Sequence, residues 1–371
     1  MRILAIDVGT GTQDILLFDS SQPIENAFQL IMPSPTMIAA GRIRRATEAG
    51  RAVAVTGMIA GGGPCHWALE DHLKAGLSAF ATREAAATFD DDLEVVQRMG
   101  VTLISDKEIG RVNADSVTLR DLDLAAIRAA LAAFDVSGDV DGLALGCLDH
   151  GAAPQGYSDR LFRFDHLRRV VELRNDLREF ACLPDEVPEY LTRARSVLAC
   201  ADEGVPTVFL DTGPAAALGA LQDPIVGERE QQVVLNLGNM HALCFHLRGT
   251  QIVSLYEHHT GEITREQIED FTKRLIAGTL PHEDVFGSKG HGVFYAGSQE
   301  QVASSKNQFV AVTGPQRGKL RGSRLEPYFA VPHGDMMMSG CFGLLWAFAE
   351  KYPSFSGEIL PSLGVEGVSA R

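Results

Sequence analysis

Two short apolar runs, residues 3–8 and 15–18, flank a polar turn at the start of the chain. Apolar segments on both sides of a glycine-containing turn are typical of a β-hairpin. The turn reads Gly9-Thr10-Gly11-Thr12. Glycine lets a backbone approach a ligand closely, so the N–H groups of this turn could surround a phosphate while Asp7 holds a hydrated Mg²⁺. An ordinary hairpin that binds nothing is the alternative interpretation.

Further along the chain, short continuous apolar runs alternate with segments of helical periodicity, which predicts an α/β fold. Continuous runs of this kind are typical of strands buried on both faces of a parallel sheet. The strands expected after the hairpin are 23–32, 52–56, 142–146 and 207–210. The helices expected between them include 36–50, capped by Thr36, and 123–134, capped by Asp123.

The hairpin pattern returns in the second half of the chain. A strand beginning at Gln232 leads into the turn Asn236-Leu237-Gly238-Asn239 and continues along a second strand. A repeat of this kind suggests two lobes of related build. We therefore expect a first lobe over 1–222, with an inserted segment at about 61–140, and a second lobe over 223–371.

The last long helix, predicted over 336–350 with Asp335 as its cap, contains two glycines. Gly340 and Gly343 each cost a helix about 1 kcal/mol relative to alanine. A close approach by another backbone or by a ligand would explain why both are glycine.

Composition narrows the possible functions. The chain has 371 residues, of which 45% are hydrophobic, and a net charge of −15, as expected for a globular protein of two large lobes. No apolar run approaches the roughly 20 residues of a membrane span. Asp7 interrupts the only stretch that resembles a signal peptide, and strong acidity disfavours nucleic acid as a partner. We therefore expect a cytoplasmic protein with neither a membrane nor a nucleic-acid partner.

Six cysteines are spread over the chain, and no two of them form a CxxC pair. The sequence has neither zinc-ribbon spacing nor the closely grouped cysteines of a radical iron–sulfur enzyme. We therefore expect reduced and partly buried thiols. The cysteines are residues 65, 147, 182, 200, 244 and 341.

Polar loops follow three of the strands expected in the first lobe, at 61–66, 147–150 and 211–213. Because parallel sheets bind ligands at the carboxyl ends of their strands, these loops should converge on one edge. The run Gly61-Gly62-Gly63-Pro64 could be an anion-binding nest or a plain connection.

Asp149 and His150 are candidate catalytic residues, since an adjacent pair in a loop at the end of a strand could bind a hydroxylated substrate. They could also hold a metal together with Cys65, His66 or Cys147. A loop histidine satisfied by ordinary hydrogen bonds is the alternative.

Five segments, taken together, resemble the actin, sugar kinase and heat-shock ATPase superfamily. They are Asp7-x-Gly9-Thr10 with Asp19 (first phosphate motif), 213–219 (first connecting helix), 236–239 (second phosphate motif), 312–317 (adenosine motif) and 334–343 (second connecting helix). The resemblance implies ATP bound between two ribonuclease-H-like lobes, the duplicated βββαβαβα fold. The whole chain is similar to a prokaryotic branch labelled pyruvate formate-lyase activating enzyme. That label implies radical chemistry, and the cysteine pattern argues against it.

The resemblance also implies roles for single residues. Mg²⁺ would be held through water by Asp7, with help from Asn236, which stands where the superfamily usually has Asp. Thr313 replaces a usual glycine of the adenosine motif. Asp211 would be a catalytic carboxylate, although an N-cap for helix 215–221 is a second and compatible role. The residues implied in ATP binding are Gly9, Thr10, Gly11, Thr12, Asn236, Gly238, Asn239, Gly314, Arg317, Gly334 and Asp335.

The favoured function is therefore an ATP-dependent phosphotransferase or ATPase that uses Mg²⁺ and a small-molecule acceptor. One alternative is a binding protein that kept the fold and lost the chemistry, which Asn236 and Thr313 favour. Another is an ATP-driven activator of a second enzyme, acting through a protein partner or as a homodimer.

Overall fold

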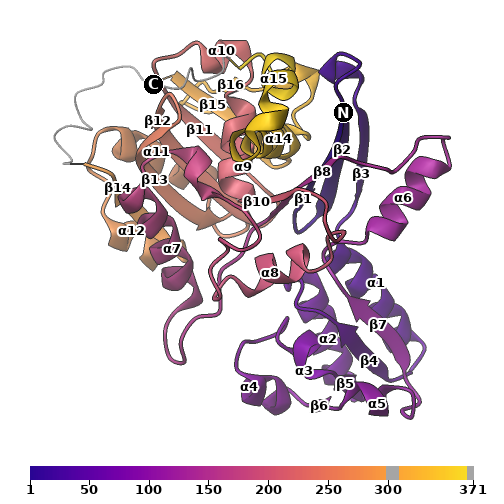
Figure 1. Cartoon of the computed structure of the whole chain (residues 1–371). Helices are drawn as coiled ribbons and strands as arrows, with labels where there is room; N and C mark the ends of the chain where they lie inside the picture. Colours follow the sequence, from indigo (N-terminus) through magenta and orange to yellow (C-terminus); the bar gives the residue numbers. More distant parts are fainter. Residues whose placement is uncertain (298–308, 366–371) are drawn as a thin grey trace.

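The computed structural model describes residues 1–297 and 309–365. Within them, two six-stranded sheets and one four-stranded sheet organise the chain. Figure 1 shows the two larger sheets together in the upper body, with helices between them, and the smaller sheet in a separate unit below.

The first six-stranded sheet has a three-stranded antiparallel part continued by two parallel strands and a short antiparallel strand at the edge. This is the sheet order of a ribonuclease-H-like lobe. In spatial order its strands are β3 (Phe28–Pro33), β2 (Thr12–Asp19), β1 (Arg2–Val8), β8 (Gly142–Cys147), β10 (Thr207–Asp211) and β9 (Ala181–Cys182). The predicted hairpin is confirmed, and the third strand begins at Phe28 rather than Pro23 because a 3₁₀ turn, Ile24–Asn26, precedes it.

The second six-stranded sheet repeats this arrangement, with a central strand antiparallel to one neighbour and parallel to the other. In spatial order its strands are β14 (Gly292–Tyr295), β13 (Gln251–His259), β12 (His241–Arg248), β11 (Gln231–Leu237), β15 (Phe309–Thr313) and β16 (Tyr328–Phe329). The chain therefore has the duplicated α/β fold that the internal repeat predicted.

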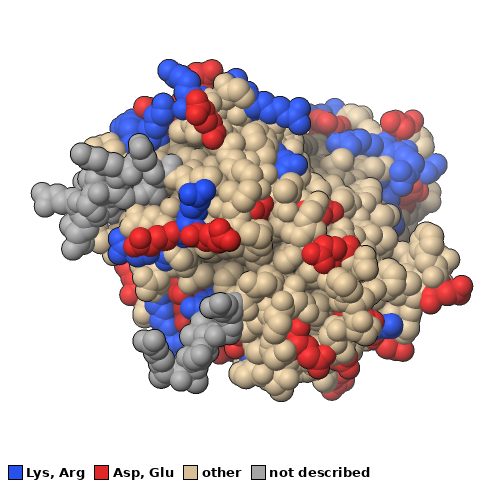
Figure 2. Space-filling model, turned by 90° about the horizontal axis from the view of Figure 1, so that it is seen from above, with Lys and Arg blue, Asp and Glu red and all other residues tan. Residues whose placement is uncertain are grey.

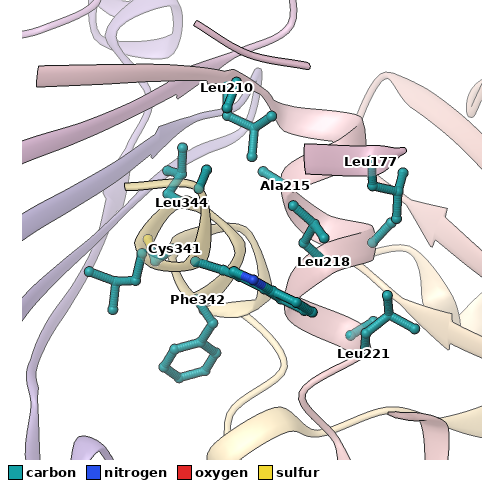
Figure 3. Close-up of a cluster of buried hydrophobic side chains, with 14 of the residues drawn as sticks. Leu177, Leu210, Ala215, Leu218, Leu221, Cys341, Phe342 and Leu344 are labelled. Carbon is teal, nitrogen blue, oxygen red and sulfur yellow. The ribbon is translucent and has the colours of Figure 1, made fainter. Parts of the chain in front are cut away.

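Two helices join the lobes at the centre of the molecule, α9 (Thr212–Ala220) and α14 (Ser339–Lys351). Their apolar side chains meet in the cluster drawn in Figure 3, which also takes in Leu210 of β10. A methyl group on Gly343 would overlap the carbonyl of Ala215, and one on Gly219 would overlap that of Ser339. The close approach of another backbone is thus confirmed at Gly343, whereas Gly340 makes room for the side chain of Asp7.

The four-stranded sheet is parallel throughout and has its own apolar core. In spatial order its strands are β6 (Val101–Leu103), β5 (Ala79–Ala81), β4 (Val53–Gly57) and β7 (Asp115–Leu119). The strand expected at 52–56 therefore pairs here rather than in the first-lobe sheet. We propose that the inserted unit runs from Pro35 to Leu119, within a first lobe that ends before β11.

The remaining helices cover these sheets. They are α1 (Pro35–Glu48), α2 (Pro64–Lys74), α3 (Arg83–Ala86), α4 (Leu93–Arg98), α5 (Asp106–Ile109), α6 (Leu124–Ala132), α7 (Asp159–Leu173), α8 (Thr192–Leu198), α10 (Pro224–Gly227), α11 (Arg265–Ile276), α12 (His282–Gly287) and α15 (Pro353–Ser362). Asp123 caps α6 as predicted, through a hydrogen bond from the Ala126 N–H.

Two predicted caps are wrong. Ser34 rather than Thr36 caps α1, because Pro35 opens the helix and the Thr36 hydroxyl donates to the carbonyl of Gly62. The helix predicted from residue 336 begins at Ser339, and Asp335 instead accepts from the Met337 N–H in the preceding turn.

Charged side chains of both signs are spread over the face drawn in Figure 2. Basic and acidic side chains are interspersed there among uncharged ones. In the described part of the chain, no helix combines the length and apolar character that crossing a membrane requires.

Candidate functional site

The two glycine turns face each other across the gap between the lobes and line one cavity of about 90 Å³. Both have the same hairpin geometry. The Gly9 N–H donates to the Thr12 carbonyl at 3.0 Å, and the Gly238 N–H donates to the His241 carbonyl at 2.9 Å. Among the described residues, the next two N–H groups of each turn donate no hydrogen bond. These four groups belong to Thr10, Gly11, Asn239 and Met240.

The turns also touch. A methyl group at Gly11 would overlap the side-chain amide of Asn239. Glycine is therefore required at residue 11 by the opposite lobe and not by a strained φ, because Gly11 is outside the set of residues with positive φ. The two turns therefore meet, as expected, and in this structure they are in direct contact.

Asp7 lies at the end of β1, on the floor of this cavity, and is 7% exposed. Its Oδ1 accepts a hydrogen bond of 2.6 Å from the Thr212 hydroxyl. A methyl group at Gly340 would overlap its Oδ2, so that glycine of α14 makes room for the carboxylate. Burial raises the pKa of Asp7 to about 6.

Asp14, which the sequence analysis did not single out, is the second carboxylate of the cavity. It stands directly opposite Asp7 in the β1–β2 hairpin. Burial, followed by the charge of Asp7, raises the pKa of Asp14 to about 8. Its Oδ1 is buried and has no hydrogen-bond partner among the described residues.

Asp19, which the resemblance placed in the first phosphate motif, lies at the far end of the hairpin. It pairs with Arg2 at 2.9 Å, and hydrogen bonds from Ser21 and Arg2 lower its pKa to about 2. Counting outward from the turn would have found Asp14 instead, since hairpin register fixes which residue stands opposite Asp7.

The second lobe contributes Asn236 at the position that Asp7 holds in the first lobe, the sixth residue of its strand. Gly314 has φ +92° and packs against it, since a Cβ there would lie 2.7 Å from Asn236 Oδ1. Thr313, which replaces a usual glycine, lies 3.0 Å from the Ser339 hydroxyl, oxygen to oxygen. The threonine therefore ties β15 to the start of α14.

Four residues implied in ATP binding do not line this cavity: Gly11, Arg317, Gly334 and Asp335. Arg317 donates to the Ala330 carbonyl and lies over the Phe329 ring, so its guanidinium is used within the second lobe. The other seven line the cavity, and Gly11 packs against Asn239, which does.

A second cavity of about 600 Å³ adjoins the first and lies against the inserted unit. Thr10, Leu148, Arg193, Met240 and His241 line both cavities. Two of the three predicted loops converge here, because the glycines of residues 61–63 and both Asp149 and His150 line this second cavity, whereas no residue of 211–213 does. Its far wall is acidic, formed by Asp90, Asp91, Asp92 and Asp159.

The glycine run at residues 61–63 can form an anion-binding nest only in part. The Gly61 N–H donates to both oxygens of Asp121, at 3.1 and 3.0 Å. A Cβ at Gly61 would lie 2.7 Å from Arg193 Nη2, so the glycine admits this arginine. Arg193 also donates to Asp121 and to the Leu148 carbonyl. It is a buried cation at the border of the two cavities, and nothing in the sequence around it marks it out.

Asp211 lines neither cavity. Its two oxygens accept from the Arg163 guanidinium at 2.5 and 2.9 Å, and it caps α9 through the Gly213 N–H. Arg163 is fully buried and also contacts Glu257 at 3.3 Å. The N-cap interpretation is confirmed. Because the carboxylate is fully engaged and lines neither cavity, we assign it a structural role and do not propose it as a base.

Asp149 is likewise used by the fold, since it accepts from the N–H groups of Gly151 and Ala194. His150 is different. Its ring lies among the rings of His241 and His291, with centroid distances of 5.1 and 5.4 Å. Burial lowers the pKa of His150 to about 3, and that of His241 far below the usual value. These imidazoles are therefore neutral.

The cysteines do not join this cluster. Cys65 and Cys147 are fully buried, and burial raises the pKa of the Cys65 thiol to about 11. The Cys65 thiol donates to the Gly61 carbonyl. The predicted metal set of His150 with Cys65, His66 or Cys147 is thus wrong in its partners. All six cysteines are free thiols, and among the described residues no group of them is arranged to hold a metal. The donors do not fit an iron–sulfur cluster.

The sheet order defines a two-lobe protein with a duplicated ribonuclease-H-like fold, the fold that the resemblance to the actin, sugar kinase and heat-shock ATPase superfamily implied. Over residues 60–319 the sequence matches the family described as "Putative pyruvate format-lyase activating enzyme (DUF1786)", and the chain belongs to that family.

Solved structures give a distant likeness. One is "Lmo2764 protein, a putative N-acetylmannosamine kinase, from Listeria monocytogenes", with 9% identity, a TM-score of 0.36, and coverage of 95% of this chain and 99% of that one. Another is an activator of the 2-hydroxyisocaproyl-CoA dehydratase from Clostridium difficile with bound ADPNP, with 10% identity, a TM-score of 0.34 and full coverage of both chains. No curated protein matches the sequence significantly.

Proposed function

We propose that this protein binds ATP with Mg²⁺ between its two glycine turns and passes the terminal phosphoryl group to water or to a small molecule. The observation that carries the proposal is the pair of matched turns, one from each lobe, on the walls of one cavity. Phosphoryl transfer depends mainly on positioning and on neutralising charge, which is what two such turns supply.

The turns would hold the phosphates through the backbone N–H groups of Thr10, Gly11, Asn239 and Met240. Backbone donors without partners at the apex of a turn form a concave site for an anion. Their presence on both sides suits a chain of phosphates rather than a single carboxylate. The hydroxyls of Thr10 and Thr12 stand beside them.

Asp7 and Asp14 would hold the metal ion. Two neighbouring carboxylates with raised pKa values, one with an unpartnered oxygen, form a site of oxygen donors that suits Mg²⁺. When bound, the ion would offset the charge of the phosphates. Asn236 could hydrogen-bond a metal-bound water but adds no negative charge, so the first lobe carries the electrostatic part of the site.

Nucleotide entry would require the lobes to separate. Ligand cavities usually measure about 300–1,000 Å³, whereas the cavity between the turns measures about 90 Å³. The contact between Gly11 and Asn239 would thus belong to the closed state. Closure after binding would exclude water from the phosphates, as in other enzymes with moving lobes.

The acceptor would occupy the cavity of about 600 Å³. The acidic wall formed by residues 90–92 and Asp159 disfavours an anionic molecule and favours a hydroxylated or cationic one. Arg193, at the border of the two cavities, would stabilise negative charge on the transferred group.

The experiment compares ATP binding by calorimetry, with and without Mg²⁺, in the parent protein and two hairpin variants. Asp7→Asn should abolish the Mg²⁺-dependent part of the affinity. Asp19→Asn, in the same hairpin but at its far end, should leave it intact. Phosphate release, measured with and without candidate acceptors, then separates turnover from binding. A parent protein that binds no nucleotide would overturn the proposal.

A second candidate is a nucleotide-binding protein without transfer chemistry, which would act as a sensor or as an activator of another protein. The observation that favours it is the complete engagement of Asp211 and Asp149 by the fold, which takes both predicted catalytic carboxylates away from an acceptor. Binding of MgATP with no release of phosphate under any condition would select this candidate.

A further inference from the structure

We propose that His150, His241 and His291 hold one divalent first-row transition-metal ion, with zinc as the reference case, at the junction of the two cavities. No motif in the sequence suggests this set, because the three histidines are far apart along the chain. The site is separate from the proposed Mg²⁺ site and does not depend on nucleotide binding.

The geometry of the ring nitrogens suits a metal. One nitrogen from each of the three histidines lies within 4.8 Å of the other two. His150 Nε2 and His291 Nε2 are 3.2 Å apart. Two nitrogens at about 2.1 Å from a tetrahedral zinc ion lie about 3.4 Å from each other. A small adjustment of the rings therefore brings them to ligand distances.

A hydrogen bond between His150 and His291 is the simplest other explanation for the short distance, but it leaves the buried His241 Nε2 unexplained, and His291 Nδ1 has no partner among the described residues in either explanation. His241 Nε2 and His291 Nδ1 are buried and have no hydrogen-bond partner among the described residues. A buried polar group without a partner costs about 1–3 kcal/mol. Metal ligation would use the lone pair of His241, which the hydrogen bond does not.

The fold holds the three rings from both lobes. His150 follows β8 of the first lobe, whereas His241 opens β12 of the second. His291 precedes β14, and its backbone N–H donates to the backbone carbonyl of Glu257 at 2.8 Å. A metal here would therefore bridge the lobes directly beside the second glycine turn, which ends at His241.

The donor set indicates which ions fit. Three neutral imidazoles without a carboxylate suit zinc, iron(II), cobalt(II) or nickel(II), and are poor ligands for Mg²⁺ or Ca²⁺. His259 supplies a fourth ring, with its centroid 4.6 Å from that of His291, but it is outside the set of converging ligand atoms.

The fourth coordination position would be open to a ligand from the larger cavity. His150 and His241 both line that cavity. Zinc sites with three protein ligands and one open position are typical of catalytic rather than structural zinc. The open position would take water or an oxygen atom of the molecule bound there, such as a hydroxyl or a carbonyl.

The test is metal binding by the full chain without nucleotide. Protein stripped with a chelator is titrated with Zn²⁺, and then with Co²⁺, whose visible absorption reports coordination geometry. We expect one ion per chain and a tetrahedral Co²⁺ spectrum. His150→Ala and His241→Ala should each weaken Zn²⁺ binding by at least about 100-fold.

His66→Ala is the matched control, because His66 lines the same cavity but is outside the cluster. It should bind Zn²⁺ like the parent. Both cluster variants are checked for folding by circular dichroism, and His150→Ala, at a partly exposed loop position, keeps the test possible if His241→Ala does not fold. Equal Zn²⁺ affinity in the parent and His150→Ala, or no stoichiometric binding by the parent, would overturn the proposal. Neither result bears on nucleotide binding, which is measured separately.

Discussion

Gly11 of the first lobe and Asn239 of the second lobe pack so closely that a methyl group on Gly11 would overlap the Asn239 amide. Each residue belongs to the turn of a hairpin, and the two hairpins have matching hydrogen bonds. The distance between these two residues therefore reports how closely the two lobes approach each other at their turns.

Gly11→Ala should separate the two turns and weaken nucleotide binding by about tenfold, equivalent to about 1.4 kcal/mol. Asn239→Ala removes the overlapping group while keeping the backbone N–H, so the double variant should recover most of the affinity. Gly110→Ala, at an open position, is the control. Calorimetry on the parent, the two single variants and the double variant gives the coupling energy between residues 11 and 239. Strictly additive effects would show that the contact does not control binding.

Gly340→Ala should destabilise the protein by about 1–3 kcal/mol, because the new methyl group overlaps the buried carboxylate of Asp7. Gly357→Ala is the matched substitution in the interior of α15, where nothing lies within 4 Å of the added methyl. It should stabilise the helix by up to about 1 kcal/mol. Urea unfolding measures both. A neutral effect at residue 340 would mean that α14 and β1 are less closely packed than described.

The pair Asp7 and Asp14 should make stability depend on pH. The pKa of Asp14 is raised to about 8 from an ordinary value of 3.8, and that of Asp7 to about 6. Between those values the folded state binds more protons than the unfolded chain, so the free energy of unfolding falls as pH rises from about 4 to 8.

Asp14→Asn should remove most of this pH-dependent loss of stability. The variant should be more stable than the parent by about 1–3 kcal/mol at pH 8, but not at pH 4. Urea unfolding across this range gives the slope. Asp19→Asn is the control, since Asp19 has its pKa lowered to about 2 and titrates below this range. A parent protein equally stable at pH 5 and pH 8 would contradict the assignment.

Asp211→Asn tests whether this residue is structural. The substitution removes the negative charge that pairs with the buried Arg163 guanidinium, so the free energy of unfolding should fall by about 3–5 kcal/mol. Asp115→Asn, at the exposed pair with Arg51, should cost no more than about 1 kcal/mol. The double variant Arg163→Met with Asp211→Leu should lose less than the sum of its single changes. Unchanged stability in Asp211→Asn would restore the catalytic hypothesis.

Zinc should raise the melting temperature if the histidine cluster joins the lobes. An ion that binds only the folded state, at 100 times its dissociation constant, adds about 2.7 kcal/mol of stability. The shift should be absent in His150→Ala and present in His66→Ala. Thermal unfolding followed by circular dichroism, with and without Zn²⁺, makes the comparison. An equal shift in His150→Ala would place the bound zinc elsewhere.

Local rules were sufficient for the elements that carry the two glycine turns. Alternating apolar runs around Gly9 and Gly238 predict two hairpins, and the repeat between them predicts two lobes of one fold. Gly340 and Gly343 signalled a close approach before any partner was known, because glycine inside a helix is costly unless something occupies the space of a side chain. Hairpin register alone would also have placed Asp14 opposite Asp7.

Tertiary structure decided everything that depends on residues distant in sequence. The strand at residues 53–57 has the same apolar pattern as its neighbours, and only pairing with β5 and β7 assigns it to the inserted unit. From the sequence, Asp211 is a candidate catalytic residue. In the structure, both of its carboxylate oxygens accept hydrogen bonds from Arg163, which is buried in another helix. The three histidines meet at strand ends of two lobes. Sequence patterns encode periodicity and turns within a segment, whereas the partners of a buried charge or lone pair are set by how segments pack.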